Sequence, residues 1–388
     1  MKSVLLLNSI ANSGIVQFDP ARYALSSQAA DPDLILVRSA SLHERSVNPS
    51  LKAIARAGAG VNNIPIRQLA EQGIVVFNTP GANANGVREL TIASLLLSAR
   101  DIYEGIHWVN SLYPSDDLAQ WIENEQSGFS GIELAGKTLG VIGLGAIGGM
   151  VANTAVDLGM KVIGYDPFMS IEAAWKLSSF VQKASTLDEI YRQSDFLTLH
   201  IPLIQETKEM LSASAFGKMK NGVRIINLAR GELVNHADLL DAIHCKKVAR
   251  YVTDFPNQKF LGFKEILQIP HLGASTRESE ENCARMAALC LIDFAENGNI
   301  RNSVNYPTVC LDRGDHTRIG VMHHNKPAVI SQVTTAVADH GFNIEHMVSG
   351  TKNELGYMIV DVCGDVPDEL LAKINNFDGV IRAMVFNG

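Results

Sequence analysis

The chain has 388 residues, of which 46% are hydrophobic and 19% charged, so it is long enough for two or three domains with substantial cores. A net charge of −8 without any lysine/arginine-rich block argues against nucleic acid as a main partner, and the lack of an apolar run of about twenty residues argues against a membrane span. The five cysteines are odd in number, widely spaced and without a CxxC pair, which indicates free thiols, no metal site and a reducing, cytoplasmic compartment.

The N-terminal part alternates predicted strands with helical segments. The first apolar run predicts a strand, because it is too short for a secretory signal. The strands are expected at Ser3–Leu7, Leu34–Arg38, Ala53–Ala55 and Val75–Asn78. A long helix is expected to begin near Asn85 and to continue to Asn110.

A strand, a glycine turn, a helix, a second strand and an acid then follow in that order. The apolar run Leu139–Ile142 leads into Gly143, Gly145 and Gly148, and the next strand ends at Asp166. The three glycines respectively permit a tight turn, let a pyrophosphate approach the backbone, and allow close packing of helix on strand. The helix N-terminus attracts phosphate, and a carboxylate after the second strand binds a ribose 2′-OH but repels a 2′-phosphate. The pattern therefore predicts a dinucleotide site that prefers NAD to NADP.

The remaining strands of this part predict a doubly wound parallel sheet of the Rossmann type, an α/β fold. They are expected at Val162–Tyr165, Phe196–His200, Arg224–Leu228, Tyr251–Phe255 and Ile266–Pro270. A second long helix, Glu278–Glu296, is expected to return the chain to the first domain and make that domain discontinuous.

The C-terminal part follows a linker-like segment, Asn302–Asp315, and its element order βαββαβ predicts a ferredoxin-like unit. The elements are expected at Arg318–His323, Ala328–His340, Ile344–Lys352, Gly356–Cys363, Pro367–Asn376 and Val380–Phe386.

Nicotinamide-dependent oxidation of an alcohol needs a base for the hydroxyl proton, a cation for the substrate carboxylate and often an acid that orients the base. In a doubly wound sheet, ligands bind at the carboxyl ends of the strands. Arg230 and His271 each follow such a strand, so we interpret them as the cation and the base; the alternatives are a surface arginine and a structural histidine. His200 also ends a strand, but the adjoining Pro202 indicates a segment that lines the cofactor.

These residues resemble the motifs of the D-isomer-specific 2-hydroxyacid dehydrogenase family. The matching segments are VRSA (37–40), RAGAGVNNI (56–64), NTPGANANGVREL (78–90), GKTLGVIGLGAIG (136–148), HIP (200–202), NLARGELV (227–234) and PHLGAST (270–276). The C-terminal part resembles an ACT domain through IGVMHHNKPA (319–328) and GFNI (341–344). The resemblance implies a discontinuous flavodoxin-like substrate domain (1–95 and 281–305), a Rossmann domain (96–280) and an ACT domain (317–388).

The implied activity is NAD-dependent oxidation of 3-phospho-D-glycerate to 3-phosphohydroxypyruvate, which starts L-serine synthesis. Two alternatives remain: another D-2-hydroxyacid dehydrogenase, or a non-catalytic NAD-sensing regulator on the same fold. The resemblance assigns Arg230 to the substrate, His271 to acid/base catalysis and Asp254 to the nicotinamide side of the site. The family's glutamate partner of the histidine aligns with Gln258, which carries no charge, so Asp254 and Glu265 are further candidates.

The resemblance also implies residues around each ligand. Those expected at NAD are Gly143, Gly145, Ala146, Ile147, Gly148, Asp166, Pro202, Leu228, Ala229, Asp254, Gly273 and Ala274. Those expected at the substrate are Arg38, Ala59, Gly60, Val61, Asn83 and Arg230, with Arg56 as either a phosphate ligand or a structural ion pair. An L-serine effector would contact His323, Asn325 and Asn343, although Ala328 replaces the glycine of that motif. A homo-oligomer is expected.

Overall fold

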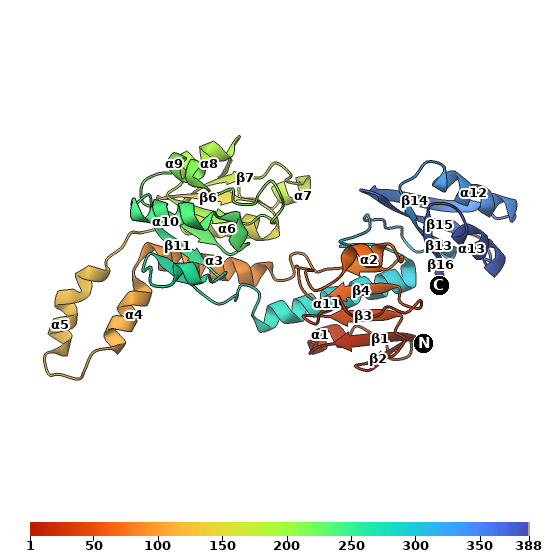
Figure 1. Ribbon diagram of the computed structural model, residues 1–388, viewed down its shortest axis with the longest axis horizontal. Coiled ribbons are helices and arrows are strands. Elements are labelled where there is room, and N and C mark those ends of the chain that lie inside the picture. Colours follow the sequence, from red (N-terminus) through yellow and green to blue (C-terminus); the bar gives the residue numbers. More distant parts are fainter. Residues whose placement is uncertain (387–388) are drawn as a thin grey trace. The chain divides into compact units, whose positions relative to one another are not determined.

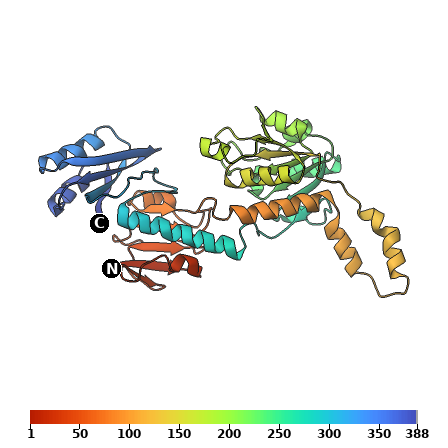
Figure 2. The same ribbon diagram turned by 180° about the vertical axis from the view of Figure 1, so that it is seen from behind.

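The computed structural model describes residues 1–386, and these form two compact units. The first unit joins Met1–Asn83 to the chain from Arg277 onward, and the second is Ala84–Thr276. The chain therefore leaves the first unit once and returns to it, as Figures 1 and 2 show by colour.

The N-terminal part of the first unit is a five-stranded parallel sheet with the order β2-β1-β3-β4-β5, which is the flavodoxin-like order. Its elements are β1 (Lys2–Leu7), α1 (Asn12–Ile15), β2 (Tyr23–Ser26), β3 (Leu34–Val37), β4 (Ala53–Arg56), α2 (Ile66–Ala70) and β5 (Val75–Phe77). The helix α11 (Arg277–Asn297) packs against this sheet through small buried residues, among them Ala284, Ala287 and Ala288. The sequence did not predict the short strand β2.

The C-terminal part of the first unit is a four-stranded antiparallel sheet with the order β14-β15-β13-β16. Its elements are β13 (Thr317–His324), α12 (Val329–Asp339), β14 (Ile344–Lys352), β15 (Leu355–Val362), α13 (Asp368–Asn375) and β16 (Val380–Phe386). The predicted ferredoxin-like plan is confirmed. The helices α12 and α13 cover one face of the sheet (Figure 1), and the other face contributes to a core shared with the N-terminal sheet.

Three phenylalanines that pack at steep angles to one another show how this shared core is built. Phe294 of α11 lies 5.8 Å from Phe77 of β5 and 5.6 Å from Phe386 of β16, measured between ring centres. The segment expected as a linker is not loose, because Asn305 and Tyr306 are buried: Asn305 bonds to Ile74 and Val76 at β5, and the Tyr306 hydroxyl donates to the Ala70 carbonyl of α2. The sequence did not predict this packing, because the segment has few apolar residues and is held by side-chain hydrogen bonds to the main chain.

The second unit contains a seven-stranded parallel sheet with the order β12-β11-β10-β9-β6-β7-β8. The strands are β6 (Thr138–Ile142), β7 (Lys161–Tyr165), β8 (Val181–Lys183), β9 (Phe196–Leu199), β10 (Val223–Asn227), β11 (Val248–Thr253) and β12 (Ile266–Gln268). The helices between them are α6 (Ala146–Asp157), α7 (Ile171–Ala174), α8 (Leu187–Gln193), α9 (Ala213–Lys218) and α10 (His236–His244). The predicted doubly wound sheet is confirmed, and its strand order reverses between β6 and β9, where such folds bind ligands.

The long helix expected from Asn85 to Asn110 is wrong as a single element. It is two helices, α3 (Ala84–Ala99) and α4 (Ile102–Asn110), which are followed by α5 (Leu118–Glu125). The helix stops because the carbonyl of Ala99 accepts the N–H of Ile132, and the Asp101 carboxylate pairs with Arg250. Both partners are distant in sequence, so local periodicity gave no sign of the break. In residues 1–386, no helix has both the length and the apolar character that a bilayer crossing requires.

Candidate active site

The glycine turn after β6 leaves space in front of a helix N-terminus. Gly143 has a φ of +89°, and a Cβ there would lie 2.4 Å from the carbonyl oxygen of His200. A Cβ on Gly148 would lie 1.9 Å from the carbonyl oxygen of Gly143, so only glycine fits. A Cβ on Gly145, by contrast, would meet no atom within 4 Å. Open space at Gly145, beside the free N–H groups of α6, fits a pyrophosphate.

Asp166 is held at the carboxyl end of β7 by two main-chain donors. Its Oδ2 accepts the N–H of Leu144 at 2.9 Å, and its Oδ1 accepts the N–H of Phe168 at 2.9 Å. Each carboxylate oxygen keeps a lone pair for a further donor, such as a ribose hydroxyl. The carboxylate is therefore fixed in place beside the glycine turn.

His200 lies behind the glycine turn and is unsuited to proton transfer. Its Nε2 is 3.0 Å from Oγ1 of Thr198, and burial lowers its pKa to about 4. Its Cβ would be 3.3 Å from a Cβ on Gly148. The ring is therefore neutral near pH 7 and supports the turn.

The loop that carries Arg230 is shaped by Asn227, a buried residue that the sequence analysis did not single out. Its Nδ2 donates to the carbonyl of Arg230 at 2.8 Å and to the hydroxyl of Tyr251 at 3.1 Å, and its Oδ1 accepts the N–H of Ala229 at 3.2 Å. The guanidinium of Arg230 is exposed beyond this loop. A polar residue at the end of the apolar strand RIINLA was the only signal that could have identified Asn227.

His271 and Asp254 follow the ends of adjacent strands, β12 and β11. The His271 ring meets Phe255 edge to face, with 4.9 Å between ring centres. Asp254 is buried, and Oδ1 of its carboxylate has no hydrogen-bond partner within residues 1–386. Burial raises the pKa of Asp254, whereas the charges of His271 and Arg230 and the N–H of Gly273 act against that rise. The structure thus brings one carboxylate, one imidazole and one guanidinium to a single edge of the sheet.

The other two candidates for the acid lie elsewhere. Gln258 is exposed in a short 3-10 turn, Gln258–Phe260. Glu265 directly precedes β12, where its carbonyl accepts the N–H of Tyr251, so it lies at the opposite end of β12 from His271. Of the three candidates, Asp254 is therefore the one whose pKa the charge of His271 lowers.

The remaining residues expected at the cofactor follow strand ends of the same sheet. They are Ala146 and Ile147 at the start of α6, Pro202 after β9, Leu228 and Ala229 after β10, and Gly273 and Ala274 after β12. They share the carboxyl edge because the strands are parallel.

The residues expected at the substrate, Arg230 apart, lie in the first unit. The Arg38 guanidinium is paired with Glu280 at 2.5 Å. Arg56 donates to the carbonyls of Arg38 and Gly60, which favours its structural interpretation over that of a phosphate ligand. Asn78 holds the neighbouring Ala59 carbonyl at 2.7 Å, so the loop 59–61 is fixed. Asn83 is half-buried at the end of the first segment.

The three residues expected at the effector are not gathered within one chain. His323 is buried on β13, where its Nδ1 is 2.7 Å from the carbonyl of His324. Asn325 follows β13, and its side chain donates to the carbonyl of Asn353, beyond the end of β14. Asn343 precedes the beginning of β14 and donates to Glu345. His323 and Asn325 therefore lie at one end of β14 and Asn343 at the other.

Comparison with known families assigns both parts of this architecture. Residues 92–273 match the NAD-binding domain of D-isomer-specific 2-hydroxyacid dehydrogenases, and residues 319–382 match an ACT domain like that of the AHAS small subunit.

Curated relatives include D-3-phosphoglycerate dehydrogenases from an archaeon and a yeast. The Archaeoglobus fulgidus protein is 36% identical over 74% of this chain, and the alignment covers 54% of that relative. The Saccharomyces cerevisiae protein named D-3-phosphoglycerate dehydrogenase 1 is 29% identical over 92% of this chain and 81% of its own length. The chain thus spans about half the length of the A. fulgidus relative.

Solved structures agree on the fold. The NAD+-bound 3-phosphoglycerate dehydrogenase of Entamoeba histolytica superposes with a TM-score of 0.60 at 27% identity, over 78% of this chain and 98% of that one. The D-mandelate dehydrogenase of Rhodotorula graminis gives a TM-score of 0.67 at 22% identity over 80% and 99% of the two chains, a likeness of fold alone.

Proposed function

Because this chain belongs to the D-isomer-specific 2-hydroxyacid dehydrogenase family, we propose that it oxidises 3-phospho-D-glycerate to 3-phosphohydroxypyruvate with NAD, the first step of L-serine synthesis. The names of its curated relatives support this substrate. The observation that carries the proposal is the meeting of Arg230, Asp254 and His271 at the carboxyl edge of the second-unit sheet. The alternative of a non-catalytic regulator would not need all three groups.

NAD, when bound, supplies the hydride acceptor. His271 accepts the proton of the substrate hydroxyl as the carbonyl forms. Arg230 holds the substrate carboxylate through paired hydrogen bonds and stabilises the developing carbonyl. Asp254, buried beside the imidazole, stabilises the imidazolium that results.

Steady-state kinetics with 3-phosphoglycerate, glycerate, lactate and longer 2-hydroxy acids test the substrate, with NADH formation as the readout. The proposal requires the highest kcat/KM for the phosphorylated acid. A preference for an unphosphorylated acid would move the chain to another activity of the family. His271→Ala should lower kcat by about two to four powers of ten, the usual contribution of a positioned acid/base. No turnover with any acid would favour the regulator.

A homo-oligomer is part of the proposal. The helices α4 and α5 extend from the second unit as an arm (Figure 1), on which Tyr103, Ile106 and Trp121 are about half-exposed. A second copy would cover these side chains. A second copy would also be needed to place Asn343 beside His323 and Asn325 around an L-serine effector. Light scattering of the purified chain, with and without serine, measures the assembly. All five thiols are free, which supports a cytoplasmic location.

A further inference from the structure

A cavity of about 850 Å³ lies beside α11 in the first unit, and its lining includes none of the residues expected at the cofactor, the substrate or serine. Its volume is within the range of small-molecule sites. The lining of the α11 cavity includes Arg285, Leu289, Ile292, Asp293, Asn297, Asn299 and Arg301.

The charges of the α11 cavity favour an anion. Asp293 is its only acid, and that carboxylate accepts from Asn297 at 2.9 Å and Asn299 at 3.0 Å and pairs with Arg301 at 3.6 Å. Arg285 is exposed at the cavity and forms no ion pair within residues 1–386. One uncompensated guanidinium therefore remains, and it can bind a carboxylate through two parallel hydrogen bonds.

The apolar part of the lining indicates the rest of the ligand. Leu289 lies one helical turn after Arg285, and Ile292 follows a further turn along the same face of α11. Leu289 is 48% exposed although it borders the cavity. A hydrocarbon chain extending from a carboxylate at Arg285 would contact Leu289 and lose water from both surfaces.

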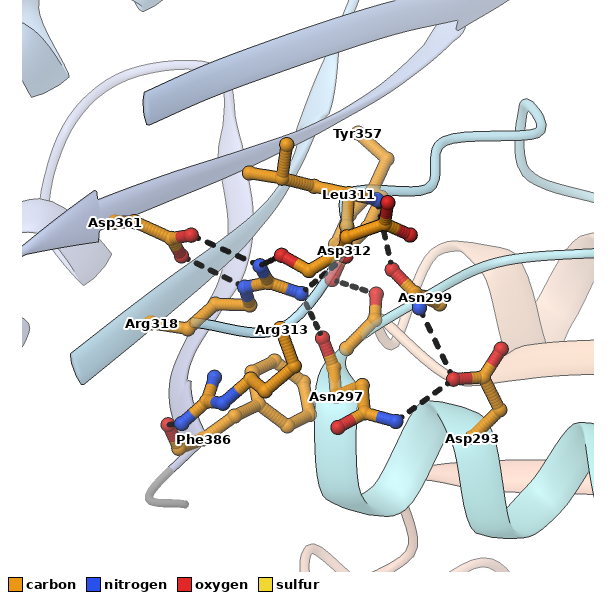
Figure 3. A network of polar contacts seen from close by, with 11 residues as sticks. Asp293, Asn297, Asn299, Leu311, Asp312, Arg313, Arg318, Tyr357, Asp361 and Phe386 are labelled. Atoms are coloured by element: carbon orange, nitrogen blue, oxygen red, sulfur yellow. Dashed lines mark hydrogen bonds and ion pairs between the residues drawn. The ribbon is translucent and has the colours of Figure 1, made fainter. Parts of the chain in front are cut away.

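Other lining residues of the α11 cavity, toward the end of α11 and just after it, also hold the C-terminal sheet in place (Figure 3). The carbonyl of Asn297 accepts Nη1 of the buried Arg318 at 2.7 Å, and Oδ1 of Asn299 accepts the N–H of Leu311 at 3.0 Å. Asp293 orients both asparagine side chains. A ligand in the cavity would thus lie against the residues that join α11 to the ACT domain.

We propose that the α11 cavity binds a small carboxylic acid with a hydrocarbon chain and that binding stabilises the junction with the ACT domain. Hexanoate is the probe, and it is tested with the full chain. Acetate lacks the hydrocarbon chain and 1-hexanol lacks the carboxylate, so they serve as control ligands. Calorimetry should give saturable binding of hexanoate only. Arg285→Ala should weaken it by about ten- to a hundredfold, because a charged hydrogen bond is lost. Leu289→Ser should weaken it by about three- to tenfold.

Arg277→Ala is the matched control, because Arg277 is an exposed arginine of the same helix outside the cavity, and it should bind hexanoate as the wild type does. Arg230→Ala should also keep binding, since the dehydrogenase site is separate in sequence and lining. Hydrogen exchange at the Leu311 amide should slow when hexanoate is present. The proposal fails if wild type shows no saturable binding, if Arg285→Ala binds like Arg277→Ala, if Arg230→Ala abolishes binding, or if exchange at Leu311 is unchanged.

Discussion

The main-chain N–H of Leu144 donates to the Asp166 carboxylate over 2.9 Å, which ties the glycine turn to the end of the neighbouring strand. Asp166 therefore has two roles: it closes the turn and presents a negative charge beside it. Substitutions can separate these roles, because asparagine keeps an acceptor for Leu144 and removes the charge.

Asp166→Asn keeps one of the two acceptor oxygens, so it should lower the melting temperature less than Asp166→Ala does, and it should narrow the preference for NAD over NADP. Asp166→Ala should also raise the KM for NAD and lower the melting temperature, because the turn loses its acceptor. Thermal unfolding and kinetics with both cofactors provide the measurements. Equal use of NAD and NADP by the wild type would contradict the role of this charge.

The glycine turn allows a second separation, between folding and cofactor binding. Gly145→Ala adds a methyl group to open space, so the protein should fold normally and bind NAD at least about tenfold more weakly. Gly148→Ala places a methyl group against the Gly143 carbonyl, so both stability and NAD binding should fall. Thermal melts and NAD titration distinguish the two. If Gly145→Ala bound NAD as tightly as the wild type does, the pyrophosphate could not bind against Gly145.

The partner of His271 can be identified from the pH–rate profile. Asp254→Asn removes the carboxylate that favours the imidazolium, so the acidic limb of kcat/KM should move to lower pH. Gln258→Glu is the control, and it should leave the limb in place because residue 258 is exposed. If Gln258→Glu moved the acidic limb and Asp254→Asn did not, residue 258 would be the position of the partner of His271.

Asp254→Asn should also change stability with pH. Burial raises the pKa of this carboxyl above 3.8 in the folded state, so the folded protein binds this proton more tightly than the unfolded chain does. The contribution of the Asp254 carboxyl group to stability is therefore lost as the pH rises above 3.8. The variant should melt at a higher temperature than wild type at pH 7, and the difference should shrink toward pH 4. A lower melting temperature at pH 7 would contradict the direction of the shift.

Arg318 and Asp361 form a buried two-bond pair, with Nε to Oδ1 at 2.7 Å and Nη2 to Oδ2 at 2.9 Å. Arg318→Ala leaves the Asp361 charge buried and alone, so the free energy of unfolding of the first unit should fall by about 3–5 kcal/mol. Lys326→Ala breaks the exposed pair with Asp378 and should cost no more than about 1 kcal/mol. Denaturant unfolding compares the two variants. Similar losses in the free energy of unfolding would show that burial does not determine how much an ion pair contributes to stability.

Ala328 occupies the position where the ACT motif has glycine, and it adopts a left-handed conformation with a φ of +67°. Ala328→Gly should raise the free energy of unfolding by about 1 kcal/mol, because glycine adopts this conformation without a Cβ clash. Ala338→Gly, an exposed site within α12, should lower it by about 1 kcal/mol. A destabilised Ala328→Gly variant would show that the turn carries no strain.

Local patterns predicted the parts of the fold that neighbouring residues determine. The turn at Gly143–Gly148 and the strands beside it follow from apolar runs and glycine spacing. The break after Ala99 depends on Ile132 and Arg250, which are far away in sequence, and the short strand β8 is too brief for a periodic signal. In the site, the sequence predicted Arg230, His271 and Asp254 at strand ends, but that Asp254 is buried and Gln258 exposed is visible only in the folded chain.

The contacts among the rings of Phe77, Phe294 and Phe386 set an order for folding during synthesis. The ribosome makes the first strands early, but their core is closed by α11 and by β16, the last strand of the chain. The second unit, Ala84–Thr276, is complete before either of these has emerged. The inserted unit can therefore fold first, while the strands that precede it stay incompletely covered until α11 and β16 have been made.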